Sequence, residues 1–288
     1  MLNKANLQFI GAEAEFSQAL TVLFGAPFDG TTSFRPGARF APQAIRLDSN
    51  GLETYSPYQD GDLTDFPIMD SGDLELPFGN PRGALDLIKE RALNILNQQK
   101  RPFLIGGEHL VTLGALEACA QIYPELRLIH FDAHTDLRQD YLGETLSHAT
   151  VIRRAHDLLG DQRIYQFGIR SGERAEFVWS SQGHTFLIPY NFAGLEIILE
   201  DLKDYPIYFT VDLDVLDPSV FPGTGTPEPG GVSFDQLRQA VTKVCAQSQV
   251  VGCDVTELSP QYDPSGVSTA VAAKIIREML IALHKNKK

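Results

Sequence analysis

Eight short runs of apolar and β-branched residues, spread along the whole chain, constrain the fold more than any other feature of this sequence. Most of these runs are continuously apolar rather than alternating, which is typical of strands buried on both faces of a parallel sheet. We therefore predict strands over residues 21–27, 66–72, 102–107, 126–134, 163–170, 185–190, 206–217 and 250–258.

Helical periodicity fills the gaps between these runs. Residues 81–99, for example, place Leu85, Ile88 and Leu96 on one face. Further helices are predicted over 110–122, 147–159, 173–181, 233–246 and 265–284. Strands that alternate with helices imply right-handed crossovers and an α/β fold with helices on both faces of one sheet, here as a single domain over 1–288. The segment from Phe28 to Gly61 shows neither pattern and is predicted to be a long non-regular loop, either functional or simply packed on the surface.

Charge and cysteine content narrow the class of protein. The 288-residue chain carries a formal net charge of −13, which disfavours nucleic acid as a partner and favours cations. Part of this acid excess can equally be solubilising surface. The three cysteines form no paired motif. We expect no signal peptide, and no apolar run reaches the roughly 20 residues that a membrane helix needs. We expect a cytoplasmic protein with free thiols and no membrane partner.

Side chains that commonly bind metals follow four of the predicted strands. They are His109 after one strand, Asp132, His134 and Asp136 after a second, Asp212 and Asp214 after a third, and Glu257 after a fourth. In a parallel sheet, binding sites form in the crevice at the carboxyl ends of the strands. A single DxD or DxHxD motif is commonly a turn or a surface acid, but four segments at one edge predict a shared site.

The spacing of these residues suggests how they converge. In an extended chain, residues i, i+2 and i+4 point to one side, so each motif is expected to aim its side chains together. Buried carboxylates are costly without a neutralising cation. The four aspartates and two histidines form a hard oxygen and nitrogen set without thiolate, which favours Mn²⁺ over Zn²⁺, with Ni²⁺, Co²⁺ and Fe²⁺ as alternatives. Six ligands suit two metal ions roughly 3.5–4 Å apart. With a hydroxide and Glu257, the site would carry a charge of about −2 and prefer a cationic substrate.

These segments resemble the ureohydrolase family, which includes arginase, agmatinase, guanidinobutyrase and formimidoylglutamase. The resemblance rests on GGEH at 106–109, DAHTD at 132–136, SHATVIRR at 147–154, DLDVLDPSVFPGTGTPEPGG at 212–231 and VTELSP at 255–260, and it covers about residues 20 to 283. It implies a three-layer α/β/α fold with a mainly parallel eight-stranded sheet, a dimanganese centre, and a homo-oligomer that is a trimer or hexamer.

The resemblance also implies roles for individual residues. One metal ion would take His109, Asp132, Asp136 and Asp212, and the other would take Asp132, His134, Asp212 and Asp214. Asp132 and Asp212 would bridge the two ions. Glu257 matches the acid that holds the guanidinium group, Thr226 lines the same cavity, and His148 matches the active-site histidine, a proton shuttle. Asp136 or Asp214 would relay a proton to the departing amine.

The expected reaction is attack of water on a guanidinium carbon, with release of urea and an amine. Arginases usually carry asparagine two residues after DAHTD, where this chain has Arg138. The segment that follows looks more like bacterial and archaeal agmatinases, with Asp140 and Glu144 as partners for a distal ammonium or as solvated acids. Agmatine is therefore the predicted substrate. Within the family the rival activity is guanidinobutyrase, in which Arg138 would pair with the carboxylate of the substrate.

Two readings outside the family remain open at the level of sequence. A deacetylase-like amidohydrolase would share the broad fold but use a single zinc ion, which the second set of ligands disfavours. A non-catalytic metal-binding protein is disfavoured because every matched catalytic position is present.

Overall fold

A single eight-stranded sheet organises the computed structural model, which describes residues 2–285. The strand order is β4-β1-β5-β10-β9-β6-β7-β8, and all neighbouring pairs are parallel. The strands are β1 (Thr21–Ala26), β4 (Ile68–Asp73), β5 (Arg101–Gly106), β6 (Arg127–Phe131), β7 (Ile164–Ile169), β8 (Phe186–Pro189), β9 (Pro206–Asp212) and β10 (Gln249–Thr256). Each predicted strand is confirmed, and so is the α/β class with a parallel sheet.

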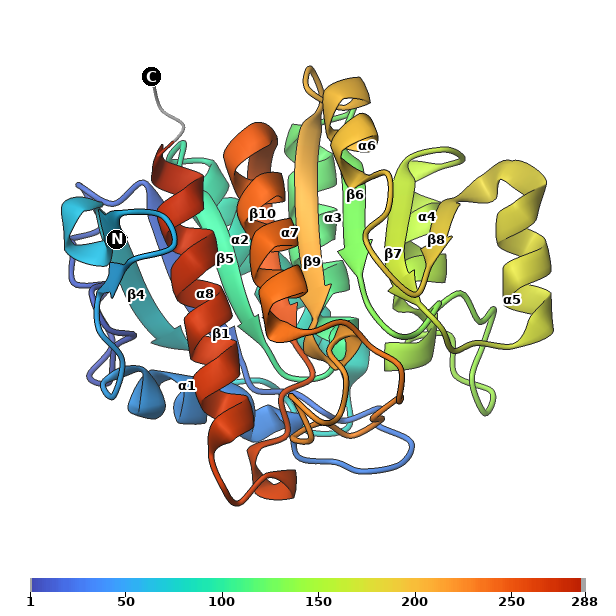
Figure 1. Ribbon diagram of the computed structural model, residues 1–288, viewed down its shortest axis with the longest axis horizontal. Helices are drawn as coiled ribbons and strands as arrows, with labels where there is room; N and C mark the ends of the chain where they lie inside the picture. The colour runs from blue at the N-terminus through green and yellow to red at the C-terminus, as the bar shows by residue number, and fades with distance from the viewer. Residues whose placement is uncertain (1, 286–288) are drawn as a thin grey trace.

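Helices cover both faces of the sheet (Figure 1). One layer consists of α1 (Ala41–Ser49), α6 (Leu195–Asp201), α7 (Phe234–Gln247) and α8 (Val267–Lys285). The other consists of α2 (Pro81–Leu96), α3 (Thr112–Ile122) and α4 (Val151–Leu159). The short helix α5 (Arg174–Trp179) lies at one end of the molecule, near β8. No helix among residues 2–285 is both long and apolar enough to cross a membrane.

Strand β5 illustrates why continuous apolar runs produced this architecture. Phe103 and Ile105 pack into the core beneath α1, α7 and α8, whereas Leu104 packs into the core beneath α2 and α3. Successive side chains of a strand point to opposite faces, so a strand covered by helices on both sides must be apolar at every position. The three side chains are fully buried.

The prediction of a wholly non-regular segment from Phe28 to Gly61 is wrong in part. It contains helix α1 and a two-stranded antiparallel pair, β2 (Tyr55–Ser56) with β3 (Gly61–Asp62). Helix α1 is short, and its buried face contains the charged Arg46 beside the apolar Ile45. The helical periodicity of apolar residues is therefore weak in this segment. Helix α6 was also missed, because seven residues are too few for a clear periodic signal.

Two strands end earlier than predicted, at the aspartates of the motifs. The Asp132 carboxylate accepts a hydrogen bond of 2.6 Å from the backbone N–H of His134, and Asp212 accepts one of 2.8 Å from the N–H of Asp214. A carboxylate that bonds the backbone two residues ahead forms a turn and competes with the strand ladder. DAHTD therefore lies just beyond β6, and DLD begins at the last residue of β9. Asp136 adopts a left-handed backbone with φ of 50°.

Candidate metal centre and active-site pocket

Four adjacent strands, in the order β5-β10-β9-β6, present their carboxyl ends to one place. The loops after β5, β6 and β9 bring together the six residues predicted as metal ligands, which are His109, Asp132, His134, Asp136, Asp212 and Asp214. All are buried except His134, which is partly exposed. The expectation that alternation alone aims DxHxD is wrong, because turns and the left-handed backbone of Asp136 provide the convergence.

The His109 ring has a defined orientation within this cluster. Its Nδ1 atom lies 3.1 Å from Asp132 Oδ2, 3.1 Å from Asp136 Oδ2 and 3.3 Å from Asp212 Oδ2. Its Nε2 atom lies 3.0 Å from the hydroxyl oxygen of Thr210, which in turn donates to the Asp254 carboxylate. This relay favours the tautomer with the proton on Nε2, which leaves the Nδ1 lone pair facing three carboxylates.

Asp132 links the carboxylates around His109 to a second group, formed by His134 and Asp214. Its Oδ2 atom faces His109, whereas its Oδ1 atom lies 3.4 Å from Nδ1 of His134. The same His134 nitrogen is 3.0 Å from Oδ2 of Asp214. A carboxylate that offers one oxygen to each of two histidines has the arrangement of a bridging ligand.

The electrostatics of the cluster fit a cation. Burial raises the pKa of Asp212 well above its usual value, and repulsion from Asp214 and Asp132 acts in the same direction. Burial and the Asp132 charge likewise raise the pKa of Asp136 to about 7. Nδ1 of His109 is buried without a well-formed hydrogen bond, although three carboxylates surround it. So many acceptors in one buried space are stabilised by divalent ions with oxygen and nitrogen ligands.

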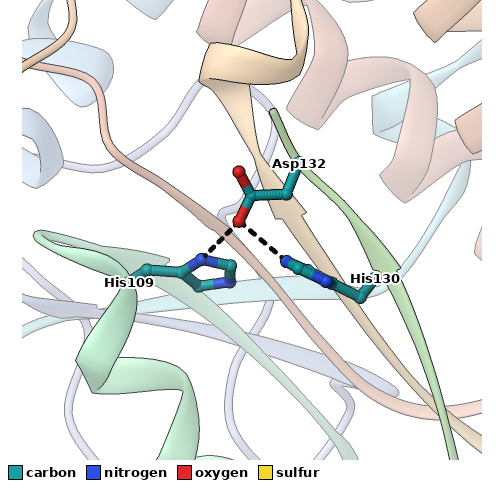
Figure 2. Close-up of side chains that lie close together, drawn as sticks. All are labelled: His109, His130 and Asp132. Atoms are coloured by element: carbon teal, nitrogen blue, oxygen red, sulfur yellow. Dashed lines mark hydrogen bonds and ion pairs between the residues drawn. The ribbon is translucent and has the colours of Figure 1, made fainter. Parts of the chain in front are cut away.

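His130 belongs to the cluster but was not predicted from the sequence. Its Nε2 atom lies 2.8 Å from Oδ2 of Asp132, and its Nδ1 atom accepts from the side-chain amide of Gln166 at 3.1 Å. Figure 2 shows His109 and His130 on either side of the same carboxylate oxygen. A histidine that donates to a ligating carboxylate fixes the orientation of that ligand. The residue lies inside β6, where its position in an apolar run conceals its role.

A cavity of about 260 Å³ opens onto the cluster, and His148 lines it. His148 begins a 3-10 turn that the side chain of Ser147 caps. Its Nδ1 atom is 3.0 Å from the backbone carbonyl oxygen of Thr31, so this nitrogen donates. Its Nε2 atom is therefore an acceptor, and it lies 3.4 Å from the hydroxyl oxygen of Ser33. Thr31 is held in turn by the buried carboxylate of Glu108, which accepts from its hydroxyl and backbone N–H. The loop containing Thr31 thus contacts a residue that lines the cavity.

Gly107 allows this loop to reach the site. A Cβ atom on Gly107 would lie 2.0 Å from the carbonyl oxygen of Phe28, so a larger residue would displace the loop that leads to Thr31. The Glu108 backbone N–H donates to the same Phe28 oxygen at 2.8 Å. The second glycine of GGEH therefore allows the close approach of two backbones.

Glu257 and Thr226 also line the cavity, as the sequence predicted. Glu257 is buried, has a φ of 65°, and accepts a hydrogen bond from the backbone N–H of His109 at 2.7 Å. Burial raises the pKa of its carboxyl well above the usual value, and the Asp214 charge adds to this effect. Thr226 donates to Asp214 at 3.2 Å. Their roles toward a substrate stay predictions.

Charged residues from two segments line the outer part of the cavity. Arg138 lines it, but its guanidinium lies 2.8 Å from Glu173 and 3.6 Å from Glu176 and stacks over the ring of Tyr141. Both glutamates line the cavity. Asp140 and Glu144 do not line this cavity, and both are exposed, which fits the solvated alternative rather than a contact with a distal ammonium. Glu173 and Glu176 come from the segment after β7. Their proximity to the cavity depends on the order of the strands in the sheet, which the sequence alone does not show.

Comparison with known proteins places this geometry in a family. The model of the arginase family matches residues 19–282. The chain belongs to the arginase family. It is 46% identical to the agmatinase of Bacillus subtilis, over 96% of each chain, and 33% identical to the guanidinobutyrase of Pseudomonas aeruginosa, over 96% of this chain and 90% of the other.

Solved structures agree with this assignment to the arginase family. The agmatine ureohydrolase of Thermoplasma volcanium superimposes with a TM-score of 0.89 at 32% identity, covering 98% of this chain and 95% of the other. The predicted resemblance and the three-layer fold are confirmed. The family implies a binuclear centre of divalent metal ions, and the donor set described above fits one.

Proposed function

We propose that this protein is an agmatine ureohydrolase that converts agmatine and water into putrescine and urea. The observation that carries the proposal is the cavity itself, which has a cluster of four aspartates and two histidines at its base and carboxylates at its rim. The 46% identity to an agmatinase over nearly the full chain supports the same substrate. Arginine-type substrates are disfavoured because Arg138 replaces the usual asparagine.

Two divalent ions, with Mn²⁺ as our proposal, would be held by the six clustered side chains and would supply a water molecule of lowered pKa. The remaining steps depend on this chain's own residues. The buried Glu257 carboxylate would orient the guanidinium by charge-assisted hydrogen bonds, and its own orientation is fixed by the His109 amide. The oxygen of water bonds to the central guanidinium carbon, and the bond from that carbon to the butyl-chain nitrogen breaks.

The departing amine needs a proton, and we propose that His148, which lines the cavity, delivers it. Burial lowers the pKa of His148 to about 4, so the ring is neutral at pH 7 and can accept a proton on Nε2. The resulting imidazolium is a strong acid in this setting and would pass the proton to the amine nitrogen. Asp136 and Asp214 remain alternative relays.

The rim of the cavity supports a substrate with two cationic ends. Glu173 and Glu176 carry two potential negative charges there, and Arg138 provides one positive charge that Glu173 already pairs. A distal ammonium would be attracted by this imbalance, whereas the carboxylate of 4-guanidinobutanoate would have to compete with Glu173 for the guanidinium. Guanidinobutyrase activity is therefore the second candidate and has less support. A single-zinc deacetylase would leave half of the ligand set unused. A non-catalytic metal-binding protein would give no role to His148 and Glu257, which line the cavity.

The deciding experiment is urea release by Mn²⁺-loaded protein from agmatine, arginine and 4-guanidinobutanoate. We expect the highest kcat/KM with agmatine. Turnover of 4-guanidinobutanoate without turnover of agmatine would refute agmatine as the substrate. It would still support hydrolysis of a guanidino group to urea and an amine. Elemental analysis should find two metal ions per chain. A homo-oligomer, trimeric or hexameric, and a cytoplasmic location stay predictions, the first of which size-exclusion chromatography with light scattering would check.

A further inference from the structure

A second cluster of ligand-type side chains lies away from the cavity. It consists of His156 near the end of α4, Asp161 before β7, and His184 before β8. One potential ligand atom from each residue lies within 4.8 Å of the other two. Asp161 and His184 precede their strands, so this cluster is at the amino edge of the sheet, whereas the metal centre is at the carboxyl edge. The length of β7, six residues, places the two edges roughly 20 Å apart.

One carboxylate oxygen organises the cluster. Oδ1 of Asp161 lies 2.7 Å from Nε2 of His156 and 2.6 Å from Nδ1 of His184. Hydrogen bonds from His184 and His156 lower the pKa of the Asp161 carboxyl, so it is ionised at neutral pH. Both imidazoles thus direct a nitrogen to a point beside an ionised carboxylate.

The backbone around these residues limits how far they can separate. Gln162 donates its backbone N–H to the carbonyl oxygen of His184 at 3.0 Å, which links the two loops. The His184 ring stacks on Trp179 with centroids 4.3 Å apart, and the His156 ring meets the same indole edge-on at 4.6 Å. The two rings are therefore held in position by contacts other than those to Asp161.

We propose that His156, Asp161 and His184 form a surface binding site for a divalent transition-metal ion, distinct from the metal centre of the cavity. Two imidazoles and one carboxylate are a ligand set that suits Zn²⁺, Ni²⁺ and Cu²⁺. Bonds of about 2.0–2.2 Å to an ion need only small shifts of side chains that already converge. The side chain of Asp161 is 60% exposed, which leaves room for water molecules to complete the coordination shell.

The chain contains an internal reporter for this site. Trp179 is the only tryptophan in the sequence, and it contacts both histidine rings. A paramagnetic ion bound between those rings should quench its fluorescence. The experiment is a titration of Mn²⁺-saturated protein with NiCl₂, followed by tryptophan emission. We expect saturable quenching with a stoichiometry of one ion per chain beyond the metal centre.

Three variants test whether the named side chains bind the ion. Asp161→Asn removes the carboxylate charge at an exposed position, and His184→Phe keeps a ring against Trp179 but removes both nitrogens. Each should weaken Ni²⁺ binding by about tenfold or more, because losing even an outer-shell partner of a ligand commonly costs about 10- to 100-fold in affinity. Asp157→Asn is the matched control, because Asp157 is a half-exposed acid on the same helix that pairs with Arg154. This control should bind Ni²⁺ like the unmodified protein.

Location of the ion provides an independent readout. Anomalous scattering at the nickel edge from a crystal of the Mn²⁺-loaded protein soaked in NiCl₂ should show a peak between His156 and His184. Equal quenching in the Asp161→Asn and His184→Phe variants and the unmodified protein would overturn the proposal. So would nickel density confined to the metal centre. In either case the three residues would be a hydrogen-bonded cluster that joins α4 to the segment before β8.

Discussion

Oε1 of Glu257 accepts a hydrogen bond of 2.7 Å from the backbone N–H of His109, across 148 positions of the chain. The bond joins the carboxylate proposed to hold the substrate to the start of the turn that carries a proposed metal ligand. The two residues follow β10 and β5, which are neighbours in the sheet. The distance between the proposed guanidinium-binding group and the proposed metal ligand is therefore set by strand pairing.

Glu257→Gln should lower kcat/KM for agmatine by roughly 10- to 100-fold, since a hydrogen bond to a charged group contributes about 1.5–3 kcal/mol. The glutamine side-chain oxygen can still accept from the His109 amide, so metal content and thermal stability should stay unchanged. Steady-state urea release and elemental analysis measure the two effects. An unchanged kcat/KM would remove Glu257 from the substrate site.

Asp132→Ala and Asp212→Ala should each abolish urea release and lower the metal content of the purified protein. Asp132 faces both His109 and His134, so its loss leaves neither group with a complete ligand set. Elemental analysis after dialysis measures the bound metal. Asp140→Ala is the matched control, because this exposed acid of the same segment does not line the cavity. Two tightly bound ions in an active Asp132→Ala protein would contradict the bridging assignment.

Thr31→Val should lower kcat about 10- to 100-fold with little change in KM, because a small misplacement of a catalytic group is costly. The Thr31 hydroxyl accepts from the His148 backbone N–H at 3.1 Å and donates to Glu108. Thr32→Val is the control, since the Thr32 hydroxyl donates to Glu108 at 3.1 Å but has no hydrogen bond to His148. If both variants lose activity equally, the hydroxyl of Thr31 has no special role in positioning the histidine.

Arg138→Gln should keep agmatine turnover and change its KM by no more than about fivefold, the range expected for a partly exposed ion pair. The change frees Glu173 and Glu176 from their cationic partner, so KM for agmatine should fall rather than rise. Urea release from agmatine and 4-guanidinobutanoate measures the outcome. A selective loss of 4-guanidinobutanoate turnover in this variant would instead support a direct contact of Arg138 with a substrate carboxylate.

Arg46→Met should lower the free energy of unfolding by about 3–5 kcal/mol, the usual cost of leaving a buried charge without its partner. Arg46 is 2% exposed and lies 2.7 Å from the fully buried Asp70. Urea denaturation monitored by circular dichroism measures the change. The double variant Arg46→Met, Asp70→Asn should recover part of the loss, because the remaining amide is neutral and its oxygen can still accept from the Phe9 N–H. No recovery would mean that packing, not charge, dominates at this position.

Local sequence patterns were sufficient for the strands, most of the helices and the candidate ligands. Continuous apolar runs such as that of β5 report burial on both faces of a sheet, and the carboxylates and imidazoles that follow such runs report chemistry at its edge. The same patterns failed for α1, where a buried ion pair replaces part of an apolar face. They also failed for His130, whose position inside an apolar strand gives no separate signal.

What only the tertiary structure decided is which distant segments meet, and in which orientation. Asp136 reaches His109 through a left-handed backbone, Arg138 is paired with Glu173, and His156 and His184 converge on Asp161. The hydrophobic periodicity of a segment depends only on neighbouring residues, because it records which face of one helix or strand is buried. Contacts between segments depend on strand order and on turns between elements, which arise from packing of the whole chain.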